Sequence, residues 1–550
     1  MANFAAPFPL HSDPRRRGVD PHEREALFGR ELTYIYHALP DLPVGVDPHE
    51  REALFGRELT YIYHALPDPP VYADGDLCVL LDDDGGGVDR LSLLPDKLLG
   101  DIVSRLPIKD AARTAVLSRR WRPIWRATPL VLVDTHLLPA GDDVIPEHLD
   151  RASSSAVADA VSCILAAHPG PFSCVRLTCC YMDEHRAQVV RWLKHLVKGS
   201  VKDLFLINRP WPLEVAPIPS TLFSMTELTC LYLGFWRFPD TTGLLRGAAF
   251  PRLRKLGLCS VYIHKQDIEF VLSRSPVLEI LCFEGLLFPL HLHLVSNSLR
   301  CLQVHGCKLA NITVADAPRL ERLFLHTYES KGLKNRIKIA HAPALRLFGN
   351  FELGKDKLQI VNTIIKARTW ANPSVTIPAV KTLDVDVRFG VRNDTKMLPI
   401  FLRCFPNVER LHIHSNNTTE SNGRLNIKFW QESGAIKPVL SRINLMVFHD
   451  FRGEQNEIAF LKFVIEKAPM LRTLMIVYAH GCFGSRHDAS SKAKALFAGK
   501  RANDRCFLAV CESERGGGAL WNLQNGSDFS CPDPFGVLQC SSFGVGHWFV

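Results

Sequence analysis

A short apolar pattern, L-x-x-L-x-L, recurs through most of this 550-residue chain and constrains its fold more than any other feature. From about Phe172 onward, clear copies share three apolar residues at this spacing: Leu228-Leu231-Leu233, Leu253-Leu256-Leu258, Leu299-Leu302-Val304, Leu320-Leu323-Leu325, Val380-Leu383-Val385, Val408-Leu411-Ile413 and Leu471-Leu474-Ile476. Weaker copies are Val201-Leu204-Leu206, Leu278-Leu281-Phe283 and Leu440-Ile443-Leu445. Alternating apolar residues predict a short strand with one buried face, so many such strands are expected to stack together.

A proline stands two residues before the first apolar position of many copies, at Pro251, Pro276, Pro318, Pro343, Pro378, Pro406, Pro438 and Pro469. Proline fits where a chain enters a strand but cannot yet donate to the ladder of hydrogen bonds, so we interpret these prolines as strand entries. The pattern resembles leucine-rich repeats in an irregular form. This resemblance implies an α/β fold, a solenoid with a concave parallel sheet and with helices or loops on the convex side.

Alternation along each strand also predicts which side chains face away from the core. In L-x-x-L-x-L-x, the residue between the last two apolar positions and the residue after them project from the concave sheet. They form a mixed aromatic, histidine and acidic set, which we take as candidate contacts for a protein substrate: Tyr232, Gln303, His305, Phe324, His326, Asp384, Asp386, His412 and His414. Such a composition is typical of a protein-binding surface.

The histidines in this set also suggest a metal site, because His305 groups with His326 and His412 with His414. Alternation on one exposed strand face explains these groupings equally well. Structural metal sites need further ligands at defined spacing, and the sequence supplies no third ligand of this kind. We therefore expect no metal and no cofactor.

A segment near residue 100 has a different pattern, that of three short helices rich in apolar residues. Pro95 opens the first helix, Pro107 breaks it, and Ser118 can cap a third. The second helix is expected from about Lys109 to Val116. A bundle this small cannot bury all its apolar side chains within itself. A partner is therefore predicted to cover the remaining apolar face, which consists of Leu94, Pro95, Leu98, Ile102, Leu106 and Pro107.

The same segment, from residue 91 to about 130, resembles the F-box in the form common in plant F-box proteins. Its elements are Leu94-Pro95-Asp96, Ile102-Val103-Ser104-Arg105-Leu106-Pro107 and Leu117-Ser118-Arg119-Arg120-Trp121. The resemblance implies docking on the Skp-type adaptor of a cullin-based ubiquitin ligase. The implied adaptor contacts are Leu94, Pro95, Leu98, Leu99, Ile102, Leu106, Pro107, Leu117 and Trp121.

Residues 446–482 resemble the FBD segment found near the C-terminus of many plant F-box proteins. The resemblance rests on Phe448-His449-Asp450-Phe451-Arg452-Gly453, Asn456-Glu457-Ile458, Leu461-Lys462-Phe463 and Lys467-Ala468-Pro469-Met470-Leu471. The expected order is strand, turn, helix, strand, with Glu457, Lys462 and Glu466 of the helix facing solvent. Trp521-Asn522-Leu523-Gln524-Asn525-Gly526-Ser527 is similar to the same group.

The N-terminal region contains a tandem duplication, because residues 18–44 and 45–71 are the same 27-residue unit and differ only at Leu42 and Pro69. Each copy is expected to form one amphipathic helix. The duplication is either recent or an error in the sequence, or it adds an interaction site. The predicted organisation is an N-terminal extension with a flexible linker (1–90), an F-box (91–132), repeats (165–445), an FBD segment (446–482), and a repeat cap and tail (483–550).

Composition argues against several other classes of function. The net charge of +8 arises from 65 basic and 57 acidic residues without a basic stripe, so we expect no nucleic-acid binding. The 16 cysteines include no C-x-x-C pair, and we interpret them as reduced thiols rather than zinc ligands. The chain has no uncharged apolar run of 18 residues, so we expect no membrane span. The expected location is the cytoplasm, the nucleus or both.

The sequence and its resemblance together predict the substrate-recognition subunit of a cullin-based SCF ubiquitin ligase, with no catalysis of its own. No G-x-S-x-G elbow, P-loop or H-E-x-x-H motif occurs in the chain. The implied partners are the Skp-type adaptor, through it the cullin and RING subunits, and an unknown protein substrate. Two alternatives remain, a ligand-sensing receptor of the same architecture and a non-proteolytic leucine-rich-repeat interaction protein.

Overall fold

The structure is a computed structural model. It describes residues 91–138, 149–210, 215–242, 250–286, 289–307, 309–327, 336–354, 356–361, 363–365, 376–416, 427–432, 436–479, 481–512 and 523–535, together with 55, 56, 59, 62 and 66–71. The first copy of the N-terminal duplication and the predicted linker lie outside these residues. In the second copy, Phe55, Leu59 and Ile62 are helical and buried, as the predicted apolar face of the helix requires.

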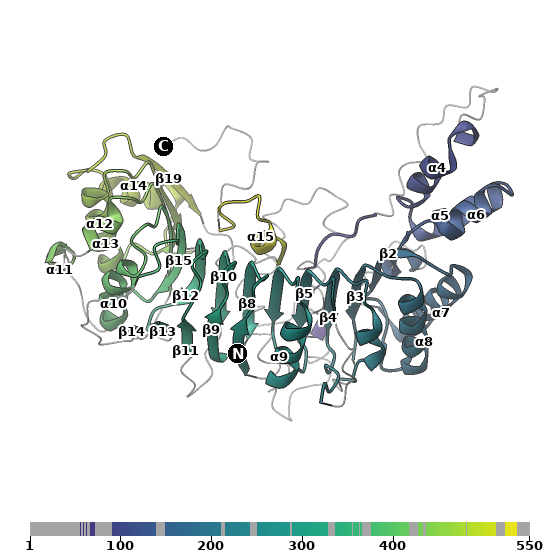
Figure 1. Ribbon diagram of the computed structural model, residues 1–550. Coiled ribbons are helices and arrows are strands. Elements are labelled where there is room, and N and C mark those ends of the chain that lie inside the picture. The colour runs from purple at the N-terminus through teal and green to yellow at the C-terminus, as the bar shows by residue number, and fades with distance from the viewer. Residues whose placement is uncertain are drawn as a thin grey trace, which may run out of the picture. The chain divides into compact units, whose positions relative to one another are not determined.

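Two compact units divide the chain, with their boundary between Leu278 and Glu279. The described part of the first unit begins at Leu66 and contains the predicted F-box. The second unit contains everything described from Glu279 onward and the described residues 55–62. Both units are built on short parallel strands, as the repeat pattern predicts (Figure 1).

Residues 91–138, all of them described, begin with a 3₁₀ turn at Leu91–Leu93 (η1) and three short helices. These helices are α4 (Asp96–Val103), α5 (Ile108–Leu117) and α6 (Trp121–Ala127). Pro95 and Pro107 immediately precede α4 and α5, where the lack of an N–H costs nothing because the first turn of a helix leaves its N–H groups unpaired. The predicted three-helix module is confirmed.

Beyond α6, strands and helical elements follow one another in the first unit. Its elements are β1 (Leu130–Val133), η2 (Asp134–Leu137), α7 (Arg151–Ala167), β2 (Phe172–Leu177), α8 (Arg186–Lys198), β3 (Asp203–Ile207), η4 (Ser220–Ser224), β4 (Cys230–Gly234), β5 (Lys255–Cys259) and α9 (Lys265–Arg274). The strands pair in chain order and in parallel. β1 follows α6 almost directly, so the strands begin before the predicted start of the repeats at residue 165.

The main sheet of the second unit is also parallel. Its order is β6 (Ile280–Glu284), β8 (Cys301–Cys307), β10 (Arg322–Thr327), β12 (Leu347–Glu352), β15 (Thr382–Val387), β16 (Arg410–Ser415), β17 (Leu445–Phe451), β18 (Thr473–Tyr478) and β19 (Phe507–Glu512). Leu281, Leu302 and Leu323 of the repeat pattern lie opposite one another on adjacent strands and are at most 1% exposed. The repeats therefore stack their leucines in one core, and the predicted solenoid is confirmed.

The chain segments between the main strands from β6 to β15 contain further strands, which form a second sheet. In sheet order its strands are β14 (Thr363–Ile365), β13 (Lys357–Ile360), β11 (Arg336–Ile339), β9 (Leu309–Asp316) and β7 (Leu290–Val295). The expectation of only helices and loops between the main strands is therefore wrong here. The sequence contained a signal for it, because Leu-His-Leu-His-Leu-Val in β7 alternates between buried and exposed side chains.

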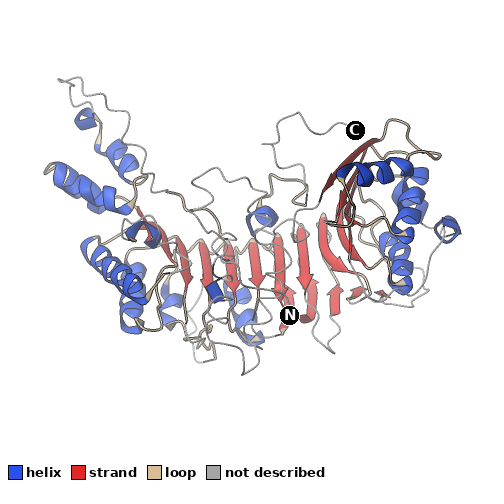
Figure 2. Cartoon of the chain, turned by 180° about the vertical axis from the view of Figure 1, so that it is seen from behind, coloured by secondary structure: helices blue, strands red, loops and turns tan. Residues whose placement is uncertain are grey.

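The helices of the second unit are α10 (Arg392–Arg403), α11 (Ile427–Glu432), α12 (Lys437–Leu440), α13 (Gln455–Lys467), α14 (Arg486–Leu496) and α15 (Leu523–Ser527). Helices α10, α13 and α14 stand on one side of strands β15 to β19 (Figures 1 and 2). The expected strand, turn, helix, strand order of the FBD segment is present as β17, α13 and β18. Glu457 of α13 is buried rather than exposed as predicted, because its carboxylate accepts the N–H groups of Arg452 and Glu454.

The recurrent prolines, apart from Pro438, occupy turns rather than strand entries. Pro251 and Pro276 are first in two-residue turns, each closed by a backbone hydrogen bond, as from Leu253 N–H to the Phe250 carbonyl. The first central position of a turn suits proline because its ring already fixes φ near −65° there. Strand β5 begins only at Lys255, several residues after Pro251, so our interpretation of these prolines is corrected.

The weak copy Leu440-Ile443-Leu445 has a different register from the predicted one. Leu411 of β16 pairs with Met446 and Ile413 pairs with Phe448, so the copy is Ile443-Met446-Phe448. Leu440 instead ends α12, the helix that also contains Pro438. Both registers place apolar residues at the required spacing, so the sequence alone could not separate them.

The described cysteines are free thiols, and most of them are buried, although Cys163 and Cys482 are exposed. Burial raises the pKa of Cys301 and of Cys307 to about 12, so both thiols stay protonated at neutral pH. Among the described residues, no helix has the length and apolar character needed to cross a membrane.

Candidate functional site

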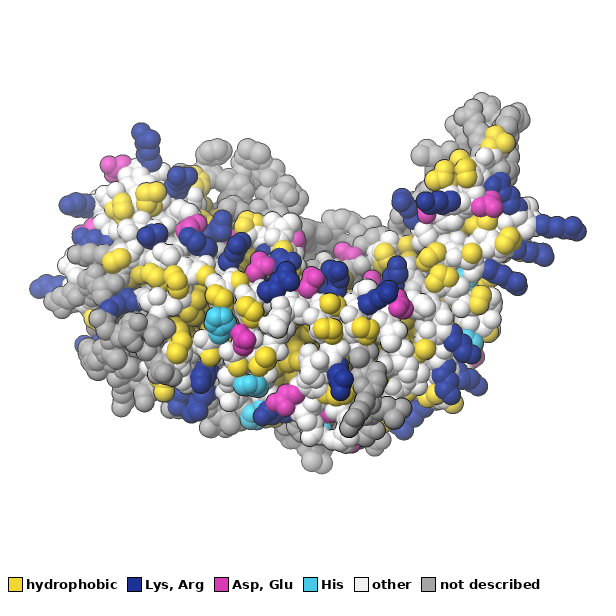
Figure 3. Space-filling view, viewed as in Figure 1, with side chains coloured by type: hydrophobic (Ala, Val, Ile, Leu, Met, Phe, Trp, Pro, Cys, Tyr) yellow, Lys and Arg dark blue, Asp and Glu magenta, His cyan; other side chains and the backbone are white. Residues whose placement is uncertain are grey.

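The helices of the predicted F-box leave apolar side chains uncovered. Leu98 and Ile102, one turn apart on α4, are 47% and 36% exposed, and Leu117 at the end of α5 is 65% exposed. The remaining predicted adaptor contacts that reach the surface, exposed or half-buried, are Leu94, Pro95, Leu106 and Pro107. Apolar and basic side chains share the surface of these helices in Figure 3. Exposed apolar groups clustered in one small module are typical of an interaction site.

Two predicted adaptor contacts point inward instead. Leu99 is 0% exposed and Trp121 is 6% exposed, so both belong to the core between the helices. A bundle this short has few apolar residues with which to hold itself together, and it uses these two for that purpose. Their predicted contact with an adaptor stays a prediction, although neither side chain is exposed in the free chain.

Sequence reasoning missed three further exposed side chains in this module. Leu91 and Leu93 of η1 are 54% and 76% exposed, and Val116 in the last turn of α5 is 79% exposed. The argument that a small bundle cannot cover all its apolar residues applied to them as well. Leu91 and Leu93 extend the apolar surface ahead of Leu94 in the chain, and Val116 precedes the predicted contact Leu117.

Arg120 positions the start of α4. Its Nε donates to Asp96 Oδ1 at 2.8 Å, and its Nη2 donates to the carbonyl of Leu94 at 2.6 Å. The two side chains of the ion pair are 41% and 68% exposed, so the pair adds little to stability. Its effect is to hold the segment Leu94–Asp96 against the start of α6.

Aromatic contacts attach the module to the first strands of its unit. The Trp125 and His168 rings meet edge to face with their centroids 5.0 Å apart, and His168 meets Phe172 in the same way at 5.1 Å. Burial lowers the pKa of His168, so the ring is neutral at pH 7. Leu130 of β1 then pairs with Phe172 of β2. The F-box helices are thus packed on the first strand pair rather than tethered to it.

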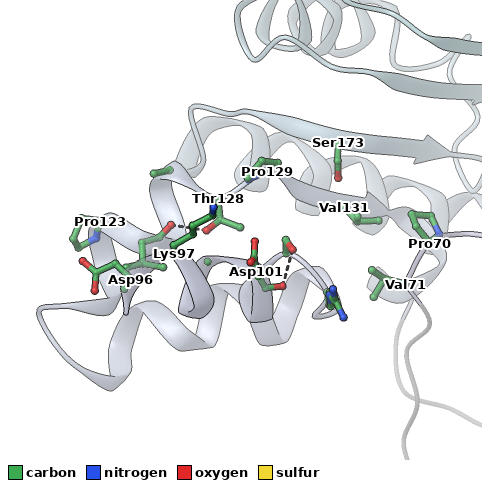
Figure 4. A pocket seen from close by; sticks show the side chains of 15 residues that line it. Pro70, Val71, Asp96, Lys97, Asp101, Pro123, Thr128, Pro129, Val131 and Ser173 are labelled. Carbon is green, nitrogen blue, oxygen red and sulfur yellow. Dashed lines mark hydrogen bonds between the residues drawn. The ribbon is translucent and has the colours of Figure 1, made fainter. Parts of the chain in front are cut away.

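A groove of about 680 Å³ lies where α4 and α6 meet β1 and β2. Asp96, Lys97 and Asp101 line it from α4, and Pro70 and Val71 lie at the other end (Figure 4). These α4 side chains alternate along the helix with the exposed Leu98 and Ile102. The groove therefore adds a charged border to the apolar surface of α4.

Tyr232 lies on the predicted face of the first unit but is only 2% exposed, so it is not the exposed contact we expected. Its ring stacks on Phe205 with centroids 5.0 Å apart and planes 4° apart, and the Arg176 guanidinium lies 5.2 Å from the Phe205 centroid. Arg176 also donates to the carbonyl of Pro67. Gly257 is opposite Tyr232 on β5, where a Cβ would lie 2.2 Å from the ring.

Strand register confirms the predicted alternation in the second unit. The paired positions on neighbouring strands are Gln303 with Phe324, His305 with His326, Asp384 with His412, and Asp386 with His414. Their exposure differs from the prediction. The buried members, each at most 2% exposed, are Gln303, Phe324, Asp384 and His412, whereas the half-buried members are His305, His326, Asp386 and His414.

The residues Leu523–Phe535, which include α15, account for much of this burial. The Phe535 ring lies 5.6 Å from the Phe324 ring and 5.5 Å from the His412 ring, centroid to centroid. Asp533 Oδ2 is 3.0 Å from His412 Nε2. A part of the chain more than a hundred residues away in sequence thus covers the face, which alternation within single strands could not predict.

Two arginines also contact this segment, Arg322 of β10 and Arg300, which immediately precedes β8. Arg322 donates to the carbonyls of Gly526 at 3.0 Å and Cys531 at 2.5 Å. The Phe529 ring lies 3.8 Å from the guanidinium carbon of Arg300 and 5.0 Å from that of Arg322. We missed Arg322 because it stands in the x-x part of L-x-x-L. It precedes Phe324 by two positions, so alternation extended backward would have placed it on the same face.

A charged histidine, His414, lies two residues after His412 on β16. His414 Nε2 is 2.8 Å from Asp384 Oδ2, and the His414 and His449 rings stack at 4.1 Å. Burial opposes charge on His414, but the charge and hydrogen bond of Asp384, with Asp386 and Asp450, raise its pKa to about 9. Burial and the neighbouring histidines lower the pKa of His449 well below its usual value. At neutral pH, His414 and Asp384 therefore form an ion pair beside a neutral imidazole.

The described residues contain no group of three histidine, cysteine or acidic side chains arranged to hold a metal ion. The His305 and His326 rings stack with their centroids 4.6 Å apart. Burial, with the charge of His326, lowers the pKa of His305 well below its usual value. This histidine grouping is therefore a stacked pair on adjacent strands, as alternation on one face explains.

Models of three domain families match the chain. Residues 91–131 match the F-box domain, residues 189–413 match the leucine-rich repeats of FBD-associated F-box protein At5g56370, and residues 431–476 match the FBD domain. The order of the three matches is the order predicted from the sequence. The predicted domain boundaries themselves stay predictions.

Curated proteins of Arabidopsis thaliana are similar over longer stretches. FBD-associated F-box protein At4g13985 is 30% identical over 260 residues, which are 44% of this chain and 53% of the relative, so the chain spans about half of that protein. F-box/FBD/LRR-repeat protein At1g13570 is 23% identical over 401 residues, 71% of this chain and 92% of the relative. F-box/LRR-repeat protein 13 is 24% identical over 440 residues, 71% and 89% of the two chains.

Proposed function

We propose that this chain, an F-box protein with leucine-rich-repeat and FBD domains homologous to the F-box/FBD/LRR-repeat proteins of Arabidopsis, is the substrate-recognition subunit of an SCF ubiquitin ligase. F-box domains imply binding to a Skp-type adaptor and, through it, to cullin and RING subunits. The observation that carries the proposal is the uncovered apolar surface of the F-box helices around Leu98, Ile102 and Leu117. Its cytoplasmic or nuclear location stays a prediction.

The mechanism that follows is proximity. F-box and leucine-rich-repeat domains are typical of non-catalytic adaptors, so the transfer of ubiquitin belongs to the partner subunits. The repeats hold a protein substrate while the F-box holds the ligase. Linking two binding events raises the effective concentration of the substrate at the transferring centre, and this accelerates the reaction without an active site in this chain.

A binding measurement with a Skp-type adaptor tests the proposal. We expect the wild-type chain to bind and a Leu98→Ala, Ile102→Ala, Leu117→Ala variant to bind roughly a thousandfold more weakly. The three side chains together lose about 4 kcal/mol of burial against the adaptor. All three are already exposed in the free chain, so the variant should keep the wild-type circular dichroism and unfolding midpoint.

A matched control carries the same kind of substitution outside the F-box, at exposed apolar residues. Val277, Val295 and Met470 are 38%, 56% and 50% exposed, and changing all three to alanine should leave adaptor binding unaltered. Equal losses in both triple variants would contradict a docking surface on α4 and α5. Failure of the wild-type chain to bind any Skp-type adaptor would refute the receptor role.

A further inference from the structure

The segment Leu523–Phe535 lies on the strand face that points away from α10. On β12, Phe348 contacts Phe401 of α10, whereas Gly349, the next residue, faces Phe535. Successive residues of a strand point to opposite sides of the sheet. The segment contacts residues of β8, β10, β12 and β16, so it runs across the strands rather than along them.

The segment begins with the helix α15 and continues through a turn, and from Asp528 to Asp533 it contacts the sheet through every second residue. Pro534, the residue before Phe535, is buried. Asp528, Ser530 and Pro532 are exposed, whereas the residues that contact the sheet are Phe529, Cys531, Asp533 and Phe535. A segment that belonged to the core would bury both sides. From Asp528 to Asp533, the alternation leaves one side of the segment exposed, as on a peptide bound at a surface.

The sheet offers three kinds of contact along this path. At one end, Arg300 and Arg322 hold the Phe529 ring by cation–π contacts. Arg322, which is 6% exposed, also donates to two backbone carbonyls of the segment, one on each side of Phe529 in sequence, a contact that depends on no particular side chain. At the other end, His412, which is 0% exposed, meets the Asp533 carboxylate.

Gly349 completes the site for the second aromatic ring. A Cβ at this position would lie 2.2 Å from the Phe535 ring, so only glycine leaves the ring room against the strand. Phe324 and His412 flank the same ring. The sheet thus carries a recess for an aromatic side chain beside a group that takes a carboxylate.

We propose that this sheet face is a peptide-binding site occupied in the free chain by its own residues 523–535, and that it takes from a protein substrate a segment of the same chemistry. That chemistry is two aromatic residues six positions apart, with an acidic residue two positions before the second, as in Phe529, Asp533 and Phe535. The inference rests on the proposed receptor role and names its substrate class. A tethered segment competes at a high effective concentration, so a substrate binds only by displacing it.

The test uses a fluorescent peptide with the sequence of residues 523–535 and a serine in place of Cys531. Its binding to the full-length chain is followed by fluorescence anisotropy. We expect the Phe529→Ala, Phe535→Ala variant, whose own segment is weakened, to bind the peptide at least tenfold more tightly than the wild type. A control peptide with both phenylalanines changed to alanine should bind neither chain.

A third variant tests the binding site itself. Adding Gly349→Ala to the double variant fills the aromatic recess, so peptide binding should return to the weak wild-type level. Equal peptide affinity of the wild type and the folded double variant would overturn the proposal and leave the segment as a structural cover. If the double variant does not fold, Asp533→Ala serves instead, and it must bind the peptide at least threefold more tightly than the wild type.

Adaptor binding separates this inference from the proposed function. The Phe529→Ala, Phe535→Ala variant keeps its F-box unchanged and should bind a Skp-type adaptor as the wild type does. Adaptor binding without peptide exchange leaves the receptor role intact and refutes the internal ligand. Peptide exchange without adaptor binding supports a peptide-binding face in a chain that is not a ligase subunit.

Discussion

The proposed interaction residues are exposed on the F-box helices but buried on the sheet face of the second unit. Leu98 and Leu117 of the F-box are 47% and 65% exposed in the free chain, whereas Phe324 and His412 of the sheet are 2% and 0% exposed. One surface is open and apolar, and the other is covered by the chain itself and contains charges. An open surface suits a constant partner, such as an adaptor. A covered surface suits a partner that must displace the covering segment in order to bind.

The first way to sharpen this comparison is to test which apolar residues of the F-box hold it together. Leu99→Ala should lower the free energy of unfolding by about 4 kcal/mol, because it leaves a cavity in a small core. Leu98→Ala, one residue along α4, should lower it by less than about 0.5 kcal/mol because the side chain is already exposed. Urea unfolding of both variants measures the difference.

These two leucines should behave in the reverse way in adaptor binding. Leu98→Ala should weaken the complex while the fold is unchanged, and Leu99→Ala should affect the complex only through loss of fold. Similar unfolding energies for the two variants would mean that α4 does not bury Leu99 as the structure shows, and the distinction between core and surface would fail.

The F-box could be predicted almost entirely from sequence because its determinants are local. Pro95 and Pro107 set the starts of α4 and α5, and the spacing of apolar residues sets the helices. The strands of the repeats were predictable for the same reason, since each depends on alternation within a few residues. What the motif did not show is which of its neighbouring apolar residues are buried, as Leu99 and Trp121 are.

The covered sheet face could not be predicted because its determinants are distant in sequence. Alternation correctly placed Phe324 and His412 on one face but contained no information on Phe535, which buries them. Glu457 failed for a related reason, because its burial depends on the N–H groups that its carboxylate accepts. Periodicity thus indicates the direction of a side chain, and exposure depends on what the rest of the chain places over it.

A second prediction uses the buried ion pair, which has no counterpart on the F-box surface. The pKa of His414 is about 9 in the folded chain, above its ordinary value of 6.5, so the folded state binds a proton that the unfolded state has lost. The stabilisation is complete below pH 6.5 and disappears as the pH rises through 9. The free energy of unfolding should fall by up to about 3 kcal/mol across this window.

The matched variant is His414→Gln, which removes the titrating group. Its unfolding energy should be lower than that of the wild type at pH 6 and nearly independent of pH from 6.5 to 9. The other charged groups that face His414 are the carboxylates of Asp384, Asp386 and Asp450. The same slope with pH in both chains would show that another group is responsible.

A third prediction concerns the covered face of the first unit. Gly257→Ala would place a Cβ 2.2 Å from the Tyr232 ring and force it out of its stack with Phe205. We expect a loss of about 2 kcal/mol in the free energy of unfolding, as for other overpacked sites. Gly499→Ala, where a Cβ would meet nothing within 4 Å, is the control and should be neutral or slightly stabilising.

The smallest expected effect is on the open surface, where Asp96 and Arg120 form an exposed ion pair. Asp96→Ala should change the free energy of unfolding by at most about 0.5 kcal/mol, because solvent screens exposed charges and two long side chains must be ordered to form the pair. The loss should disappear at 1 M salt, where the range of electrostatic interactions falls to about 3 Å. A salt-independent loss of several kcal/mol on urea unfolding would show that Arg120 supports the core of the F-box, and would contradict an open surface whose polar contacts only position its edge.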